Sequence, residues 1–364
     1  ALLLLIFLSI QVGFAQSKYQ TLDLKEVVNY NYWPNSVWGI NSMNDGEHYS
    51  AFSFDRPTRT SYIKKYSYAT GEEVEVLVNL TKLNIGWVNY NYDFSNDEDK
   101  ILFYSDDDYI YRHSFVANYY VYDLKTKKLV KVSENGKQQI ATFSPDGQKV
   151  AFVRENNIFF TDLNNLEETQ ITFDGKKNYI INGVPDWVYE EEFGFNKAYH
   201  WSPDGKNIAY IKFNESEVKE FHLLEYEGDA PKKEEFKLYP GLYTFKYPKA
   251  GEDNSIVSVH VYNLATKKTL DVDLGKEKDI YIPRILWNHD GSQLIVQYMN
   301  REQNKLDVVS VNPQTGATKV LVTETNNYYI EDNVYDNIIF PCPGTLRPPV
   351  PCFIRSPFRI IPCN

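Results

Sequence analysis

The chain has 364 residues, more than one ordinary domain needs but within the range of a large β-architecture that forms a single unit. Its net charge of -11 argues against a nucleic-acid partner, because phosphate binding requires clustered Lys and Arg, and none is evident. The 29 Tyr and 21 Phe residues, together with much Asn and Asp, favour many strands joined by polar turns.

The chain opens with an apolar run that leads into Gly13-Phe14-Ala15, small residues typical of a signal-peptidase site. The run is shorter than a membrane-spanning helix, and no initiating Met or basic segment precedes it. We therefore expect residues 1–15 to be part of a secretory signal, and the protein to be periplasmic, on the outer surface or secreted. A buried N-terminal strand or helix is the alternative, although the chain turns polar directly after Ala15.

Five polar turns recur along the chain, and each is followed by an alternating apolar run that is typical of a strand. The turns begin at Asn44, Ser95, Ser144, Ser202 and Asn288. The first four lie about 50 to 58 residues apart, a period expected of four-stranded blades. The repeat predicts an all-β fold, a β-propeller that is incomplete in this chain, over residues 46–340. A pair of β-sandwiches is the alternative, but it would not repeat one signature at blade spacing.

The composition changes abruptly near the end of the chain. Residues 341–364 hold all three cysteines, seven prolines and three arginines, but no Lys, Asp or Glu. We expect the native sequence to stop near Phe340 and the tail to result from a shifted reading frame; a genuine Pro-rich exported tail is the alternative. No cysteine precedes Cys342, so the predicted propeller relies on no disulfide.

Residues 186–194 place three consecutive glutamates, Glu190, Glu191 and Glu192, in an aromatic frame. Adjacent like charges cost free energy, so such a cluster is either solvated or meets a cation. It lies in a long connection between predicted blades that begins near Asn178, where binding groups are common. In a one-turn helix, neighbouring side chains point about 100° apart, so two carboxylates can converge on one ammonium while the third faces solvent.

Several segments together resemble the N-terminal propeller of dipeptidyl peptidase IV, a serine exopeptidase that removes dipeptides from the amino ends of peptides. They are residues 186–192 with 201–205 and 208–210 behind them, 247–251, 111–114 ahead of 122–124, and 300–304. The resemblance covers most of residues 20–340. The acidic motif and the Tyr-Pro-Lys-Ala-Gly segment are highly specific, whereas the Ser-Pro-Asp-Gly turns occur in many periplasmic propellers.

The resemblance implies that Glu191 and Glu192, the second and third glutamates of the motif, bind the protonated α-amino group of a peptide substrate. Arg112 matches the arginine that supports this site and the substrate carbonyl. A guanidinium beside two glutamates offsets their repulsion. Holding the amino terminus at a fixed distance from a nucleophile selects the bond after the second residue, so the propeller would gate the substrate for release of X-Pro or X-Ala dipeptides. Glu190 is expected to be a solvated charge.

The family's catalytic serine domain is expected to lie outside this chain. No Gly-x-Ser-x-Gly occurs, so we predict no catalytic residue here and no hydrolysis by residues 1–364 alone. No metal site or cofactor is expected either. In the family a hydrolase domain follows the propeller, and a short N-terminal arm packs on it; residues 16–45 are expected to be that arm. Family members often dimerise, which makes a homodimer of the full-length protein an expectation.

A second hypothesis is a non-enzymatic periplasmic propeller, similar to the Tol-associated scaffold, that binds a protein partner through its channel. Such a scaffold needs no ammonium site, so a requirement for Glu191 and Glu192 distinguishes the peptidase hypothesis from the scaffold hypothesis. Tripeptide release also stays open. The six histidines are interpreted as structural or surface residues, and residues 247–251 as an ordered turn. Asp106-Asp107-Asp108 is expected to be a solvated loop close in sequence to Arg112. Trp187 and Tyr189 are expected either to pack between blades or to line the substrate entrance.

Overall fold

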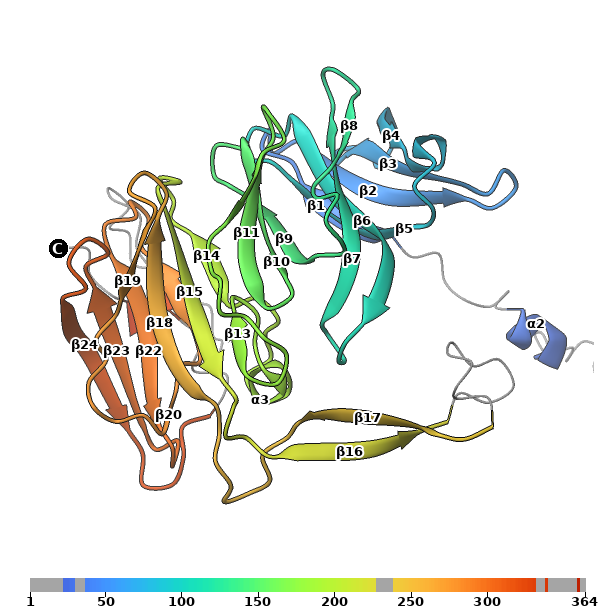
Figure 1. Cartoon of the computed structure of the whole chain (residues 1–364). Coiled ribbons are helices and arrows are strands. Elements are labelled where there is room, and N and C mark those ends of the chain that lie inside the picture. Colours follow the sequence, from blue (N-terminus) through green and yellow to red (C-terminus); the bar gives the residue numbers. More distant parts are fainter. Residues whose placement is uncertain (1–21, 30–36, 227–237, 332–337, 340–358, 361–364) are drawn as a thin grey trace, which may run out of the picture. The chain divides into compact units, whose positions relative to one another are not determined.

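A computed structural model gives the positions of residues 22–29, 37–226, 238–331, 338–339 and 359–360 (Figure 1). The predicted signal segment 1–15 and nearly all of the predicted tail 341–364 lie outside these described residues. The chain divides into two compact units, residues 1–38 and 39–364.

In the described residues of the first unit there is one short helix, α2 (Leu24–Val28). Asp23 begins it as N-cap, with a side-chain oxygen that accepts a hydrogen bond from Lys25 N at 2.8 Å. None of its residues is buried. Across the described part of the chain, no helix has both the length and the apolar character that a membrane crossing requires.

From β1 to β24 the chain forms consecutive antiparallel sheets, and the strands of each main sheet follow chain order from one edge to the other (Figure 1). The first contains β1 (Trp38–Ser42), β2 (His48–Asp55), β3 (Thr60–Ser67) and β4 (Glu73–Asn79), and the 3₁₀ helix η2 (Leu80–Leu83) follows it. The second contains β5 (Val88–Phe94), β6 (Lys100–Tyr109), β7 (Phe115–Asp123) and β8 (Leu129–Lys131). The third contains β9 (Gln139–Phe143), β10 (Lys149–Arg154), β11 (Asn157–Asp162) and β12 (Glu168–Gln170). The predicted all-β class and the succession of hairpins are confirmed.

The fourth and fifth sheets vary this plan, because the first strand of each is divided in two. In the fourth sheet, β13 (Ile180–Asn182) and β14 (Tyr199–Trp201) pair with opposite ends of β15 (Asn207–Asn214), and β18 (Ile256–Asn263) and β19 (Lys268–Asp271) complete it. In the fifth, β20 (Ile280–Tyr281) and β21 (Ile285–Trp287) both pair with β22 (Leu294–Asn300), which is followed by β23 (Lys305–Val311) and β24 (Thr318–Thr325).

The acidic motif therefore lies within the first strand of the fourth sheet, and the expectation of a connection between blades is wrong. The segment between β13 and β14 holds the helix α3 (Trp187–Glu191). Its two ends meet, since Ala198 N donates to Gly183 O at 2.9 Å and Ile211 N donates to Ala198 O at 2.8 Å. Gly183 has a φ of +79°, and a Cβ there would lie 2.8 Å from a side-chain carbon of Ile158, so only glycine fits this neck.

A second insertion separates β15 from β18. It contains the two-stranded antiparallel hairpin of β16 (Glu220–Glu225) and β17 (Gly241–Lys246). This hairpin accounts for the long interval between the turns at Ser202 and Asn288. A short parallel pair, β25 (Ile338–Ile339) and β26 (Arg359–Ile360), is the last element described.

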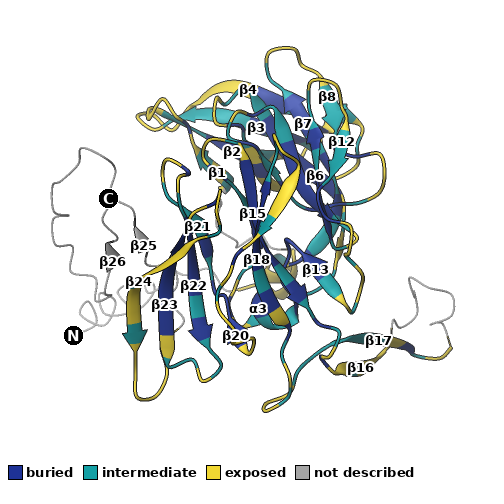
Figure 2. Cartoon of the chain, turned by 60° about the vertical axis from the view of Figure 1, so that its left-hand side comes forward, coloured by how far each residue is buried: buried dark blue, intermediate teal, exposed yellow. Residues whose placement is uncertain are grey.

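The core lies between neighbouring sheets, and burial follows a strand's place in its sheet (Figure 2). Central strands such as β10, β15 and β23 are buried along most of their length. Their apolar runs are nearly continuous because both faces are covered. Edge strands such as β19 and β24 are largely exposed and polar.

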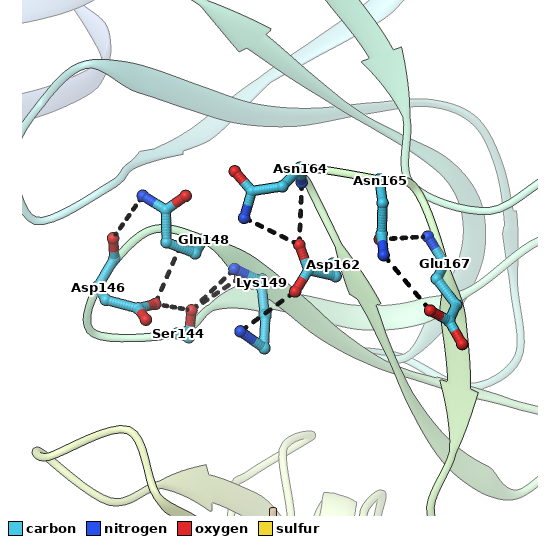
Figure 3. Close-up of polar contacts among 8 residues, drawn as sticks. All are labelled: Ser144, Asp146, Gln148, Lys149, Asp162, Asn164, Asn165 and Glu167. Carbon is cyan, nitrogen blue, oxygen red and sulfur yellow. Dashed lines mark hydrogen bonds and ion pairs between the residues drawn. The ribbon is translucent and has the colours of Figure 1, made fainter.

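The Ser-Pro-Asp-Gly turns are closed by their own side chains, as the turn at Ser144 shows (Figure 3). Lys149 N donates to Ser144 Oγ at 2.9 Å, and Gln148 N donates to Asp146 Oδ1 at 3.0 Å. Gly147 takes a φ of +64°, a backbone conformation that other residues adopt at a cost. The motif therefore sets the geometry that reverses the chain into β10.

Turns of successive sheets also contact one another. A Cβ on Gly147 would lie 3.2 Å from Ser95 Cβ, in the turn of the preceding sheet. The equivalent pairs are Gly205 with Pro145 and Gly291 with Pro203. In addition, Asn96 Nδ2 donates to Pro145 O at 2.9 Å. The recurrence of one small, polar turn thus has a packing reason as well as a conformational one.

Candidate functional site

The helix α3 is only five residues long and depends on its surroundings for stability. Asp186 is its N-cap: Oδ1 accepts from Tyr189 N at 3.0 Å, and Oδ2 accepts from Ser255 Oγ at 2.6 Å. Burial raises the pKa of Asp186, and these hydrogen bonds oppose the rise. This role was not predicted for Asp186, although an Asp directly before a short helical motif is a recognised N-cap signal.

Tyr189 anchors the helix to the core. Its side chain is 1% exposed, its hydroxyl accepts from Ile282 N at 3.0 Å, and its ring centroid lies 4.9 Å from that of Phe213. The packing interpretation of Tyr189 is confirmed. Trp187 is half-buried instead, with its ring centroid 4.3 Å from that of Tyr247.

The three glutamates of the motif point to different surroundings. Glu190 is 1% exposed, and its Oε1 accepts hydrogen bonds from His113 N at 2.6 Å and Ser114 N at 2.9 Å. The expectation that Glu190 is a solvated charge is wrong. Because each helical residue turns the side-chain direction by about 100°, the three glutamates leave the helix in different directions, and the first is buried against the backbone of the β6–β7 loop.

Glu191 meets the arginine that the motif comparison singled out. Arg112 Nε lies 3.5 Å from Glu191 Oε1, and the side chains are 73% and 18% exposed, respectively. An ion pair this open contributes about 0–1 kcal/mol to stability. Most of the guanidinium donors of Arg112 therefore face solvent and are available to a ligand.

Glu192 is exposed and lines a cleft of about 740 Å³. Trp187 lines it from the same helix, and Phe245 and Tyr247 line it from the end of the β16–β17 hairpin and the residues after it. Residues 247–250 form part of the wall, so the Tyr-Pro-Lys-Ala-Gly segment borders the same cleft as the acidic helix. The cleft offers an aromatic surface next to one carboxylate.

Other predicted features have structural roles. Asp106 and Asp108 are exposed but lie in strand β6, so the expectation of a loop is wrong; both pair with Lys137 Nζ, at 3.0 and 2.7 Å. Of the histidines, His260 contacts Asp271 at 2.7 Å, and burial lowers the pKa of His200 to about 3. Both fit the structural interpretation.

Sequence reasoning missed one buried acid near the helix cap, Glu215. It is 5% exposed, and burial raises its pKa from 4.5 to about 7, with a further rise from the charge of Asp186 that Lys246 opposes. It follows the end of β15, in a segment with no motif to mark it.

Because the pKa of Glu215 is raised, replacing its carboxylate with a neutral side chain should increase the free energy of unfolding at high pH only. The folded state binds this proton more tightly than the unfolded state, so the favourable contribution is complete below about pH 4.5 and lost as the pH rises to about 7. Glu215→Gln should leave the free energy of unfolding near the wild-type value at pH 4.5 and raise it by about 3 kcal/mol at pH 8. Urea unfolding at both pH values measures this, with the exposed neighbour variant Glu217→Gln as control. An equal effect of Glu215→Gln at the two pH values would contradict the prediction.

The protein-family model described as the dipeptidyl peptidase IV N-terminal region matches residues 95–345 of this chain. The chain belongs to the dipeptidyl peptidase IV family. The crystal structure of Porphyromonas gingivalis dipeptidyl peptidase 4 is similar, with a TM-score of 0.79 and 39% identity over 89% of this chain and 45% of that chain. A probable dipeptidyl-aminopeptidase B of Tuber melanosporum is 35% identical over 62% of this chain and 27% of that protein.

A putative dipeptidyl aminopeptidase IV from Bacteroides ovatus, at 22% identity and a TM-score of 0.59, shares the fold. The resemblance inferred from the acidic motif is thus confirmed at the level of the dipeptidyl peptidase IV family. The chain spans less than half of the length of each of these three relatives.

Proposed function

We propose that this chain is the substrate-gating propeller region of a dipeptidyl peptidase IV-like serine exopeptidase, and that it binds the amino terminus of peptides. The observation that carries the proposal is the placement of Glu191 as the last residue and Glu192 as the C-cap of one core-anchored helix, with Arg112 Nε 3.5 Å from Glu191 Oε1. Membership of the family and the peptidase relatives support it. The scaffold alternative gains no specific support.

The chemistry of the site suits a peptide ammonium group. An ammonium has three donors, and two carboxylates can accept them in charge-assisted hydrogen bonds. Arg112, exposed beside Glu191, has free donors for the first carbonyl of the same peptide. Fixing both groups sets the register of the peptide, so release of dipeptides would follow from the distance to a nucleophile in the hydrolase domain. The proposed X-Pro or X-Ala preference rests on the resemblance to the family.

The proposal includes the organisation of the protein. Residues 46–340 would be blades of an incomplete propeller, and residues 16–45 an arm that packs on the hydrolase domain. Export from the cytoplasm and a homodimer of the full-length protein are part of the same proposal.

A comparison of free and blocked peptides tests the proposed function. The peptide Ala-Pro-Ala-Gly with a free amino terminus should bind the purified chain at least about 30-fold more tightly than its N-acetyl form, because acetylation removes the charge and two of the donors. Isothermal titration calorimetry or NMR titration at pH 7 measures both. Equal affinities would rule out an ammonium site.

A further inference from the structure

The buried first glutamate connects the acidic helix to the loop that carries Arg112. Glu190 Oε1 accepts hydrogen bonds from His113 N at 2.6 Å and Ser114 N at 2.9 Å, the two amides that follow Arg112. In the segment between α3 and β14, Asn196 Nδ2 donates to His113 O at 2.9 Å. The insertion between β13 and β14 therefore holds His113 by both its N–H and its carbonyl.

The other contacts found for the loop involve residues 110, 111 and 114, and the ring centroid of Tyr111 lies 6.1 Å from that of Phe245. Residues 110–114 connect β6 to β7, and inside the loop Ile110 N donates to Ser114 O at 2.8 Å. Tyr243 Oη donates to Ile110 O at 3.1 Å. Because the Arg112 side chain is 73% exposed, packing does little to direct it, and the direction it takes depends on the backbone of residues 112–114.

The chemistry of Glu190 suits such a role. Two amides on one carboxylate oxygen form charge-assisted hydrogen bonds, which are shorter and stronger than neutral ones. At 1% exposure, water competes little for them. The second oxygen, Oε2, is buried with no hydrogen-bond partner among the described residues, so the contacts found for this carboxylate are those to the loop.

We infer that Glu190 is a positioning residue: it fixes the backbone after Arg112 against α3 and so holds the Arg112 guanidinium beside Glu191. It does not contact the peptide. In this proposal the three glutamates have different roles: Glu190 holds the loop, and Glu191 and Glu192 face the ligand. The effect on peptide binding rests on the proposed function, whereas the link between helix and loop does not.

A double-mutant cycle on the full chain tests the inference. Glu190→Ala should weaken binding of the free-amine peptide about 10-fold, while Glu190→Gln, whose amide oxygen still accepts both hydrogen bonds, should stay within about 3-fold of wild type. In an Arg112→Ala background, Glu190→Ala should add less than about 2-fold, because Glu190 acts on binding only through the position of the Arg112 guanidinium. Independent, multiplying effects, or equal losses for Gln and Ala, would overturn the role.

Amide hydrogen exchange of residues 110–114 provides a readout that needs no ligand. Exchange should be faster in Glu190→Ala and close to wild type in Glu190→Gln. The matched control is Glu168→Ala, which removes a carboxylate that Arg154 holds in the third sheet; it should alter stability without changing exchange in this loop or peptide affinity.

The two readouts separate the two proposals. If the wild-type chain does not distinguish free from acetylated peptide, the proposed function fails, and the exchange data still decide the role of Glu190. If peptide binding is normal but loop exchange is the same in all variants, the role of Glu190 fails and the proposed function stands.

Discussion

Replacing both Glu191 and Glu192 with glutamine is expected to lower the affinity for a peptide with a free amino terminus by about 100-fold or more. Charge-assisted hydrogen bonds between an ammonium and carboxylates contribute about 1.5–3 kcal/mol each, and an amide oxygen recovers only part of this. The N-acetyl peptide, which presents no charge, should bind the double variant and the wild type alike. Calorimetry on both peptides measures the difference.

The control for that experiment removes the same two charges elsewhere. Glu72 and Glu73 are neighbouring and exposed in the first sheet, so Glu72→Gln with Glu73→Gln should leave peptide affinity unchanged. In a protein that carries the hydrolase domain, the Glu191 and Glu192 double variant should also lose kcat/KM for dipeptide release. Unchanged kcat/KM would remove the assignment of this pair, and binding of a protein partner that survives the change would favour the scaffold hypothesis.

Tyr189→Ala is expected to be the most destabilising single change at the site, at about 4 kcal/mol in the free energy of unfolding. The substitution empties a fully buried aromatic position and leaves the Ile282 amide without its acceptor. Tyr189→Phe keeps the ring and loses only that hydrogen bond, so it should cost about 1–3 kcal/mol. Urea unfolding followed by tryptophan fluorescence gives both values.

A tyrosine at the surface provides the comparison. Tyr328 is 83% exposed, and Tyr328→Ala should change the free energy of unfolding by about 0.5 kcal/mol or less. A similar cost at Tyr189 and Tyr328 would show that the helix is not anchored in the core. Such a result would also weaken the argument that α3 holds its glutamates in fixed positions.

The features that were predictable from sequence are local ones. Turns such as the one at Ser144, and apolar runs such as β10, depend on residues within a few positions of each other, and they were found. The divided first strand of the fourth sheet was missed because β13 and β14 have three residues each, too few to show an alternating pattern. The β16–β17 hairpin was missed as well, although the long interval between the turns at Ser202 and Asn288 indicated an insertion.

For the candidate site, too, some features were predictable from the sequence and others were not. The acidic motif identified the family, and the motif match named Arg112, which lies beside Glu191 in the structure. The burial of Glu190 could not be read from its neighbours, since its partners His113 and Ser114 are distant in the chain. Three identical side chains in a row give no local signal of which one faces the core.

The neck of the α3 insertion separates two kinds of sequence constraint. Gly183 and Ala198 bond to each other and to Ile211, so hydrogen bonds fix the register of the sheet directly beneath the insertion. Within the insertion, Asp186 and Tyr189 are buried, whereas Glu192 is exposed. We therefore expect substitutions at the exposed positions to change the surface of the insertion without shifting the pairing of β15, and substitutions at the buried positions to lower stability.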